Sequence, residues 1–488
     1  MNNIFDKLKN YSDSDYYAFH MPGHKRNRDL MDGTSPYRID ITEIDGFDDL
    51  HHAEGILRDA QERAARVYHA DETHFLVNGS TVGILSAILG TTEKGDSILV
   101  ARNCHKSVYH AIYLNELDPV YLYPKFDTEQ GLSTEIDAAD VQKALEEHPK
   151  IRAVMIVSPT YDGVVSDIEK IAEIVHAKGC PLIVDEAHGA HFGFDPYFPK
   201  SANIYGADLV INSLHKTLPA LTQTALLHVN GDMVNRRKVK QYLDMLQTSS
   251  PSYILMASID ACIGMLEETL ETHSDARSDY KYKNIFSEYA KRIEALRKDL
   301  KRLKYLKIIQ TDNTDRYDRS KFVISVKHAP MSSHELYEIL LHRYHLQMEM
   351  LAGTYVLAMT TVGDTQEGLD RLRDALLEID KEIDTRQGRP AAIETDLPLS
   401  GRQPALEKVW TIAEAVNRRD KIQKRSFEDS IGCISVEYAY LYPPGSPLIV
   451  PGERITKEAV EILHWYQEHD FSIEGLQSED GIEVWIDG

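Results

Sequence analysis

The sequence predicts an α/β protein whose largest part is a doubly wound, mostly parallel sheet covered by helices on both faces. Over residues 51–305, short apolar runs such as 153–157 and 181–185 alternate with helical stretches such as 168–178. Several of these runs are followed directly by polar or charged residues. Because open α/β sheets bind ligands at the carboxyl ends of their strands, we expect a functional site at that edge of the sheet.

The remainder of the chain divides into shorter parts. After residue 305, an apolar run at 321–326 is followed by a helical stretch at 333–343 and a strand at 354–359, which predicts a smaller α+β domain. Proline, glycine and polar residues then accumulate, as is typical of a linker. The expected organisation is an N-terminal arm over 1–50, a large domain over 51–305, a small domain over 306–385, a linker over 386–404 and a C-terminal domain over 405–488.

The composition is that of an acidic globular protein. Among 488 residues, 54 are Lys or Arg and 77 are Asp or Glu, which gives a formal net charge of -23. Such a charge repels nucleic acid. The sequence contains no run of about 18 apolar residues, so no membrane span is predicted. The start of the chain lacks a basic region followed by an apolar core, so we expect a cytoplasmic protein. The four cysteines contain no CxxC pair, so we expect reduced thiols and no metal site.

The strongest chemical signal is a lysine and an aspartate that each follow an apolar strand. Residues 180–185, Cys-Pro-Leu-Ile-Val-Asp, end in Asp185, and residues 208–212, Asp-Leu-Val-Ile-Asn, lead to Lys216. Pyridoxal phosphate (PLP) needs an amine to hold its aldehyde and an anion to keep its ring nitrogen protonated. The pattern therefore predicts a PLP site, with Lys216 as the amine and Asp185 as the partner of the ring nitrogen. A surface lysine and a strand-capping aspartate are the alternative for either residue alone.

A phosphate site is predicted where the apolar run 73–77 meets the turn Asn78-Gly-Ser-Thr-Val-Gly83. Small and hydroxyl residues at the start of a helix leave backbone N–H groups free for an anion. The same residues are also ordinary turn and cap chemistry. Ser213, three residues before Lys216, is a further candidate phosphate ligand.

Three histidines lie close to these candidates in the sequence. His105 follows the apolar run 97–100, so its imidazole is expected at the same sheet edge, where it could stack on the pyridine ring. A solvated loop histidine is the alternative. His188 and His215 adjoin the aspartate and the lysine, and they are candidates for tuning the proton on the lysine–cofactor bond or for acting as acid near the reacting carbon.

Nine motifs occur in order along most of the chain. They are His20-Met-Pro-Gly-His-Lys25, Asp48-Asp-Leu-His51, Asn78 to Thr81, Arg102 to Ser107, Ser158-Pro-Thr-Tyr-Asp-Gly163, Asp185 to Gly189, Ser213 to Thr224, Tyr442-Pro-Pro-Gly-Ser-Pro447 and Pro451-Gly-Glu-Arg454. Together they resemble the Orn/Lys/Arg decarboxylases of the aspartate aminotransferase-like fold (PLP fold type I), in particular the short bacterial arginine/lysine decarboxylase group. The N-terminal flavodoxin-like domain of longer relatives is not expected here, which makes their ring assemblies doubtful.

The resemblance implies a role for each matching position. Lys216, His215 and His188 are the expected catalytic residues. One departure is that relatives often have Gly-Thr-Ser at the first turn, where this chain has Gly79-Ser80-Thr81, so the individual hydroxyl contacts are in doubt. The expected cofactor contacts are Lys216, Asp185, His105, His188, Ser80, Thr81, Ser213 and His215.

The implied activity is PLP-dependent decarboxylation of arginine, lysine or ornithine to agmatine, cadaverine or putrescine, by a homodimer or higher homo-oligomer. Lys216 or His215 is the expected donor of the proton that replaces the carboxylate. The acidic segment 40–49 is a candidate for binding a cationic substrate, and a solvated loop is the alternative. The candidate substrate residues are Asp45, Asp48, Asp49 and Glu453.

Two other functions stay open from the sequence. An aminotransferase of this fold usually holds the substrate α-carboxylate with an arginine from the small domain. Arg343, Arg371 and Arg373 lie in that region but resemble helix-face residues. A non-catalytic regulator on the same fold is the other alternative, and the intact set of lysine, aspartate and histidines argues against it.

Overall fold

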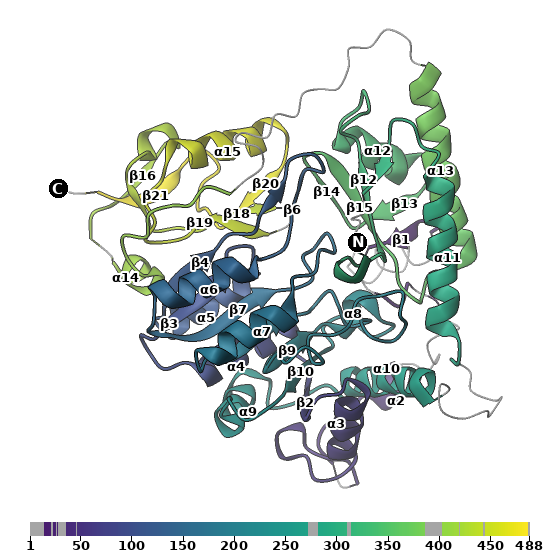
Figure 1. Cartoon of the computed structure of the whole chain (residues 1–488), viewed down its shortest axis with the longest axis horizontal. Helices are drawn as coiled ribbons and strands as arrows, with labels where there is room; N and C mark the ends of the chain where they lie inside the picture. Colours follow the sequence, from purple (N-terminus) through teal and green to yellow (C-terminus); the bar gives the residue numbers. More distant parts are fainter. Residues whose placement is uncertain are drawn as a thin grey trace.

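The computed structural model describes residues 14–20, 23–25, 27, 36–44, 46–271, 282–309, 314–385, 403–418, 420–442 and 445–486. At its centre is a seven-stranded sheet with the strand order β2-β10-β9-β8-β7-β3-β4 (Figure 1). β10 is antiparallel to both of its neighbours, and the other neighbouring strands are parallel. The strands are β2 (Glu72–Leu76), β3 (Ser97–Ala101), β4 (Asp118–Leu122), β7 (Ile151–Val157), β8 (Leu182–Asp185), β9 (Leu209–Asn212) and β10 (Ala225–Val229).

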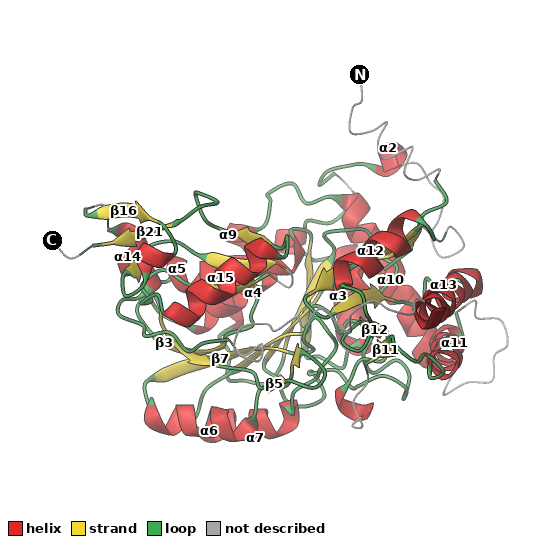
Figure 2. Cartoon of the chain, turned by 90° about the horizontal axis from the view of Figure 1, so that it is seen from above, coloured by secondary structure: helices red, strands yellow, loops and turns green. Residues whose placement is uncertain are grey.

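Helices cover both faces of this sheet, which explains why its central strands are almost continuously apolar. β8 and β9 are buried over their whole length. Figure 2 shows α6 and α7 on one side of the sheet and α4, α5 and α9 on the other. The helices are α4 (Gly79–Thr91), α5 (Lys106–Leu114), α6 (Ala138–Glu147), α7 (Ile168–Ala177) and α9 (Arg236–Leu246). The carboxyl ends of the parallel strands remain open between these layers.

The small domain is built on an antiparallel four-stranded sheet with the order β11-β12-β15-β14. Helices α11 and α13 pack against each other beside it (Figure 1). A hydrophobic core continues from these helices into the large domain. The elements are β11 (Lys307–Ile308), β12 (Lys321–Ser325), β14 (Met350–Ala352), β15 (Tyr355–Met359), α11 (Ile285–Leu300), α12 (Ser333–His342) and α13 (Gln366–Thr385). α10 (Tyr253–Glu271) precedes them in the chain.

The described part of the N-terminal segment packs on the small domain of its own chain. β1 (Tyr17–Phe19) pairs in parallel with β13 (Leu346–Met348). Lys25 is buried, and its ammonium donates to the carbonyl of Met359 at 2.8 Å. The segment then leads through α2 (Pro36–Ile39) to α3 (Ile56–Val67), which precedes β2. The contact of this arm with a partner subunit stays a prediction.

The C-terminal region has a hydrophobic core of its own. It contains two three-stranded sheets, with the orders β16-β21-β17 and β19-β18-β20. Figure 1 shows this region lying beside β3 and β4 of the large sheet. Its elements are α14 (Ile412–Asn417), β16 (Ile422–Arg425), β17 (Ile434–Ser435), β18 (Ala439–Tyr442), β19 (Ser446–Ile449), α15 (Lys457–Glu468), β20 (Ser472–Glu474) and β21 (Ile482–Trp485).

The elements follow the order expected from the sequence, and the numerical domain borders stay predictions. The expected linker falls almost entirely outside the described residues. Within the described ranges, no helix has both the length and the hydropathy that a bilayer span requires.

Candidate active site

Two neighbouring strands bring the predicted lysine and aspartate to one edge of the sheet. β8 ends at Asp185, and β9 leads through Ser213 into the short helix α8 (Leu214–Thr217), which carries Lys216. The strands are parallel, with Asp185 paired to Ile211. Both side chains therefore leave the carboxyl edge of the sheet, as the sequence predicts.

Burial controls the charges of this pair. Asp185 is only 4% exposed, and its Oδ1 accepts the backbone N–H of Ala187 at 3.1 Å. Burial raises the pKa of Asp185, while the nearby Lys216 opposes that rise. Burial likewise lowers the pKa of Lys216, and Asp185 opposes that change. The aspartate therefore retains capacity for a further N–H donor, and the lysine is shifted towards its neutral, nucleophilic form.

His188 contacts the lysine directly. Its Nε2 lies 3.0 Å from Nζ of Lys216, and its Nδ1 lies 3.4 Å from Nζ of Lys321, which enters from β12 of the small domain. The ring of Tyr161 lies 4.4 Å from the His188 ring, centroid to centroid. Burial, followed by the two lysines, lowers the pKa of His188 well below its ordinary value. The imidazole is therefore neutral where it meets the lysine.

His105 caps the first turn of α5. Its Nδ1 accepts the backbone N–H of Ser107 at 3.2 Å. Burial, together with the charge of Lys216, lowers the pKa of His105 to about 4. A neutral ring in this position suits stacking on an aromatic cofactor better than an imidazolium would.

The predicted phosphate contacts come from two places in the chain, the start of α4 and the residues at α8. The start of α4 is open to an anion, because Gly79 has a φ of 75° and Asn78 makes no side-chain cap to the helix. Ser80 faces the cavity described below, whereas Thr81 is exposed and does not line it. Ser213 is fully buried, and its Oγ has no hydrogen-bond partner among the described residues.

His215 is predicted both as an acid near the reacting carbon and as a phosphate-side contact, and both roles stay predictions. Its Nδ1–H donates to the carbonyl of Thr224 at 2.9 Å, and it does not line the cavity. Its backbone carbonyl accepts the N–H of Gly23 at 2.6 Å. Burial lowers the pKa of His215 to about 4. The ring therefore holds the loop that follows α8.

A cavity of about 240 Å³ lies at this sheet edge, between the three domains. The hairpin of β5 (Phe126–Asp127) and β6 (Leu132–Ser133) forms part of its wall. The residues that line the cavity include Ser80, Asn103, His105, Leu132, Tyr161, Asp162, Asp185, His188, Lys216, Tyr355, Leu448, Ile462 and Tyr466. Among the lining residues that the structure describes, the carboxylic acids are Asp162 and Asp185, and no arginine is present.

The residues of this cavity fit PLP. A buried carboxylate, an amine shifted towards neutrality and a neutral imidazole match the ring nitrogen, the aldehyde and the ring face of the cofactor. Two buried oxygen atoms have no partner among the described residues and could bind the cofactor's polar groups. They are Oδ1 of Asn103, which lines the cavity, and Oγ of Ser213, which lies outside its described lining. The uncapped start of α4 suits a phosphate.

The acidic residues predicted to bind the substrate lie outside the cavity where the structure describes them. Asp48 accepts the backbone N–H groups of Glu54, Gly55 and Leu57 at 3.1, 2.7 and 3.0 Å, so its carboxylate organises the turn before α3. Asp49 caps the 3-10 helix η2 (Leu50–His52). Neither residue lines the cavity, and Asp45 lies outside the described residues. Their substrate role stays a prediction.

Glu453 is fully buried in a structural ion pair. Its Oε2 lies 2.8 Å from Nη2 of Arg102, which also donates to the carbonyl of Leu448 at 3.0 Å. The guanidinium lies 4.7 Å from the ring centroid of Tyr121. This pair joins the loop before His105 to the C-terminal region, and Glu453 does not line the cavity.

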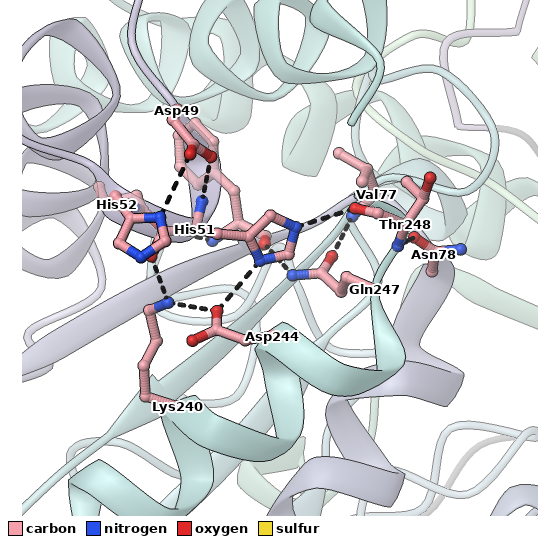
Figure 3. Close-up of polar contacts among 11 residues, drawn as sticks. Asp49, His51, His52, Val77, Asn78, Lys240, Asp244, Gln247 and Thr248 are labelled. Carbon is pink, nitrogen blue, oxygen red and sulfur yellow. Dashed lines mark hydrogen bonds and ion pairs between the residues drawn. The ribbon is translucent and has the colours of Figure 1, made fainter. Parts of the chain in front are cut away.

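The N-terminal motif that ends in His51 is tied to the phosphate turn through α9 (Figure 3). Nδ1 of His51 lies 3.0 Å from Asp244, and its Nε2 lies 2.8 Å from the carbonyl of Thr248. The N–H of Thr248 in turn donates to Oδ1 of Asn78 at 3.2 Å. Lys240 donates to the carbonyl of His51 at 2.7 Å. These bonds explain why the side chain of Asn78 does not cap α4.

Three residues near the cavity were not identified from the sequence. Asp162 lies within the motif Ser158-Pro-Thr-Tyr-Asp-Gly163, which signalled the loop but not the direction of its carboxylate. Tyr355 and Lys321 lie in apolar strands of the small domain, where the local pattern predicts only core packing. Their proximity to the site depends on how the two domains meet.

Comparison with known proteins identifies the family of the chain. The protein-family model "Orn/Lys/Arg decarboxylase, major domain" matches residues 2–345, and the family model "Orn/Lys/Arg decarboxylase, C-terminal domain" matches residues 402–484. An uncharacterized protein of Bacillus subtilis (strain 168) is 36% identical over 468 residues, covering 94% of this chain and 93% of that protein. Arginine decarboxylase of Bacillus anthracis is 31% identical over 490 residues, covering 97% of this chain and 94% of its own.

Solved structures share the fold. Lysine decarboxylase A from Pseudomonas aeruginosa has a TM-score of 0.76 at 20% identity and covers 91% of this chain and 73% of its own. Alanine–glyoxylate aminotransferase from Nostoc sp. has a TM-score of 0.52 at 13% identity and covers 72% of this chain and 100% of its own. The fold is therefore aspartate aminotransferase-like, PLP fold type I, with a large doubly wound domain, which confirms the predicted fold class. The chain belongs to the Orn/Lys/Arg decarboxylase family, which confirms the resemblance found in the sequence.

Proposed function

We propose that this chain is a PLP-dependent decarboxylase that converts a basic amino acid into the corresponding amine and CO2. The observation that carries the proposal is the pair of a partly buried Lys216 and a buried Asp185 at the carboxyl edge of the sheet, with His188 at 3.0 Å from the lysine amine. Arginine is the first substrate to test, since the relative from Bacillus anthracis that matches almost the full chain is named arginine decarboxylase. Lysine and ornithine are the other candidates.

Each residue of the site has a role in this proposal. When bound, PLP supplies a protonated ring that accepts the electron pair left as CO2 departs. Asp185 would hold the proton on the ring nitrogen, and His105 would cover one face of the ring. Ser80, Ser213 and the start of α4 would hold the phosphate. Of these predicted contacts, Ser80 lines the described cavity, whereas Ser213, Thr81 and His215 are not among its described lining residues.

Lys216 would bind the cofactor aldehyde and later deliver a proton to the α-carbon from its Nζ. Nε2 of His188 lies close enough to return a proton to that amine. His215, the other predicted donor, instead bonds the carbonyl of Thr224. Apolar side chains, including Leu132, Leu448 and Ile462, line the cavity and solvate a carboxylate poorly, which favours the departure of neutral CO2.

The aminotransferase alternative lacks a matching arginine in the described part of the cavity. Arg343 pairs with Glu378 and Glu382 on the surface. Arg371 donates to the carbonyl of Tyr344, and Arg373 pairs with aspartates on α13 and α11. None of the three lines the cavity. The regulator alternative gives no reason for so complete a set of buried reactive groups.

Product identification tests the proposal. Purified protein with PLP is incubated separately with arginine, lysine and ornithine, and the products are measured by mass spectrometry. Agmatine, cadaverine or putrescine is expected, and Lys216→Ala is expected to lose the activity. A keto acid formed in the presence of an acceptor, without any amine, would instead identify an aminotransferase. The homodimer and the cytoplasmic location stay predictions.

A further inference from the structure

The cavity contains one carboxylate that the proposed cofactor chemistry does not use. Of the two acids among its described lining residues, Asp185 is assigned to the cofactor ring, which leaves Asp162. The acids predicted from the sequence, so far as they are described, lie outside the cavity. A basic substrate carries a positive charge at its far end, and a buried cation needs a counter-charge.

Asp162 lies in the loop between β7 and α7 and is only 6% exposed. Its Oδ1 accepts the hydroxyl of Tyr355 at 2.5 Å, and Tyr355 lines the same cavity from β15. The hydrogen-bond donors that act on this carboxylate are Tyr355 and its own backbone N–H, and no ion pair within 4.0 Å joins it to another described residue. Burial raises the pKa of Asp162 to about 6, because it removes the carboxylate from water.

We infer that the carboxylate of Asp162 binds the cationic end of the substrate, a primary ammonium or a guanidinium, with Tyr355 holding the carboxylate in place. The inference rests on the proposed function and specifies its substrate-binding residue. A carboxylate has about four acceptor sites, so beside its bond from Tyr355 it can accept two N–H donors of a guanidinium or one of an ammonium. The apolar walls formed by Leu132, Leu448 and Ile462 suit the methylene chain between the two ends.

A structural role as counter-charge for Lys321 is the competing explanation. Lys321 does act on Asp162 electrostatically, since it lowers the pKa of the carboxyl. The ammonium of Lys321, however, contacts Nδ1 of His188, and it forms no ion pair with Asp162 within 4.0 Å. Asp318 and Glu349 also act on Lys321: both carboxylates raise its pKa, and Asp318 has the larger effect. Lys321 therefore has other anionic neighbours, and Asp162 is left without a close cation.

The test compares Asp162→Asn with the wild-type holoenzyme. We expect KM for the preferred basic amino acid to rise about 10- to 100-fold, as for the loss of one charge-assisted hydrogen bond, while kcat changes much less. Discrimination against neutral analogues, citrulline for arginine or norleucine for lysine, should fall by a similar factor. Asp140→Asn, an exposed position on α6, is the matched control and should leave all constants unchanged.

Two further measurements separate this inference from folding and from the proposed function. The thermal midpoint and the cofactor absorbance of Asp162→Asn should match the wild type, which shows that the site is assembled. If Asp162→Asn does not fold, Asp162→Glu is used, and its longer side chain should shift the preference from lysine towards the shorter ornithine. An unchanged KM and unchanged discrimination in a decarboxylating Asp162→Asn variant, or an unchanged preference in Asp162→Glu, would overturn the inference. A wild-type protein that forms no amine would overturn the proposed function itself.

Discussion

Nε2 of His188 lies 3.0 Å from Nζ of Lys216, while the other ring nitrogen faces a second buried lysine, Lys321, at 3.4 Å. An ammonium can only donate, so a charged Lys321 donates to Nδ1 and leaves the single hydrogen of the neutral imidazole on Nε2. That hydrogen points to Nζ of Lys216, which can accept it in the neutral form towards which burial shifts this lysine. Only the neutral amine can add to an aldehyde, so Lys321 prepares the lysine through the histidine.

The first prediction concerns Lys321→Met. Without its donor, His188 is free to change tautomer, and we expect kcat to fall about tenfold, which corresponds to one charge-assisted hydrogen bond of roughly 1.5 kcal/mol. Burial lowers the pKa of Lys321 to about 8, so the wild-type rate should decline as the pH rises through that value, and the variant should lack this decline. Steady-state kinetics from pH 6 to 10 measures both effects.

Lys301→Met is the control, because Lys301 is exposed at the end of α11. Lys321→Arg should keep part of the activity, since arginine retains a donor and its charge. A pH profile that is the same in Lys321→Met and in the wild type would show that Lys321 only packs the domain interface.

The sequence was sufficient for the centre of the site because this centre depends on local rules. Lys216 and Asp185 each follow an apolar strand, and parallel strands place such residues at one edge. The phosphate turn follows β2 in the same way, with Ser80 at the start of α4. These positions follow from strand and helix periodicity together with ordered motifs.

Contacts between domains could not be predicted in this way. Tyr355 and Lys321 reach the site from the small domain, and Glu453 meets Arg102 across the border with the C-terminal region. A single sequence shows which residues are acidic but not which acid faces a cavity. For that reason the acidic segment around Asp48 suggested a substrate site. In the structure, the carboxylate of Asp48 instead accepts backbone N–H groups.

A second prediction follows from the raised pKa of Asp162. Apart from burial, the groups that act on this carboxyl are Tyr355 from β15, Lys321 from β12 and the backbone N–H of Asp162 itself. Its pKa of about 6 means that the anion is present above pH 6 and is lost as the pH falls below it. Because kcat/KM reports the free enzyme, we expect it to fall below about pH 6 for a basic substrate.

Asp162→Asn should lack this acidic decline while keeping its lower kcat/KM at pH 8. A neutral substrate analogue should show no decline that depends on residue 162. The comparison needs rates for both substrates from pH 5 to 8. The same acidic decline in the wild type and in Asp162→Asn would assign it to another group.

A third prediction concerns the bonds that tie His51 to the phosphate turn. His51→Ala removes contacts to Asp244 and to the carbonyl of Thr248, whose N–H holds Asn78. We expect the dissociation constant for PLP to rise about fivefold, which corresponds to one hydrogen bond of about 1 kcal/mol. At saturating PLP, kcat should change little. Titration of the cofactor-free protein with PLP, followed by fluorescence, measures the constant.

His52 provides a matched control for this experiment. Its side chain is 83% exposed, and it lies 3.2 Å from the carboxylate of Asp49 without touching the turn. His52→Ala should bind PLP as the wild type does. If His51→Ala and His52→Ala bind PLP equally, the link from the N-terminal motif to the phosphate turn has no energetic consequence.

The fourth prediction separates a structural role of Glu453 from the substrate role suggested by the sequence. Glu453→Ala leaves the fully buried charge of Arg102 without its partner, and breaking a buried ion pair in this way costs about 3–5 kcal/mol of unfolding free energy. Denaturant titration should show this loss. Glu453→Gln keeps a hydrogen-bond acceptor and should cost less.

Because Glu453 does not line the cavity, KM for the basic amino acid should be unchanged in Glu453→Gln. Glu474→Ala is the control for removal of a glutamate from the same region, since Glu474 is half exposed and lies 3.8 Å from Lys106. That exposed pair should contribute less than about 1 kcal/mol. A Glu453→Gln variant of unchanged stability whose KM is raised would reverse the assignment: it would restore Glu453 as a substrate residue and require the Arg102 pair to open when substrate binds.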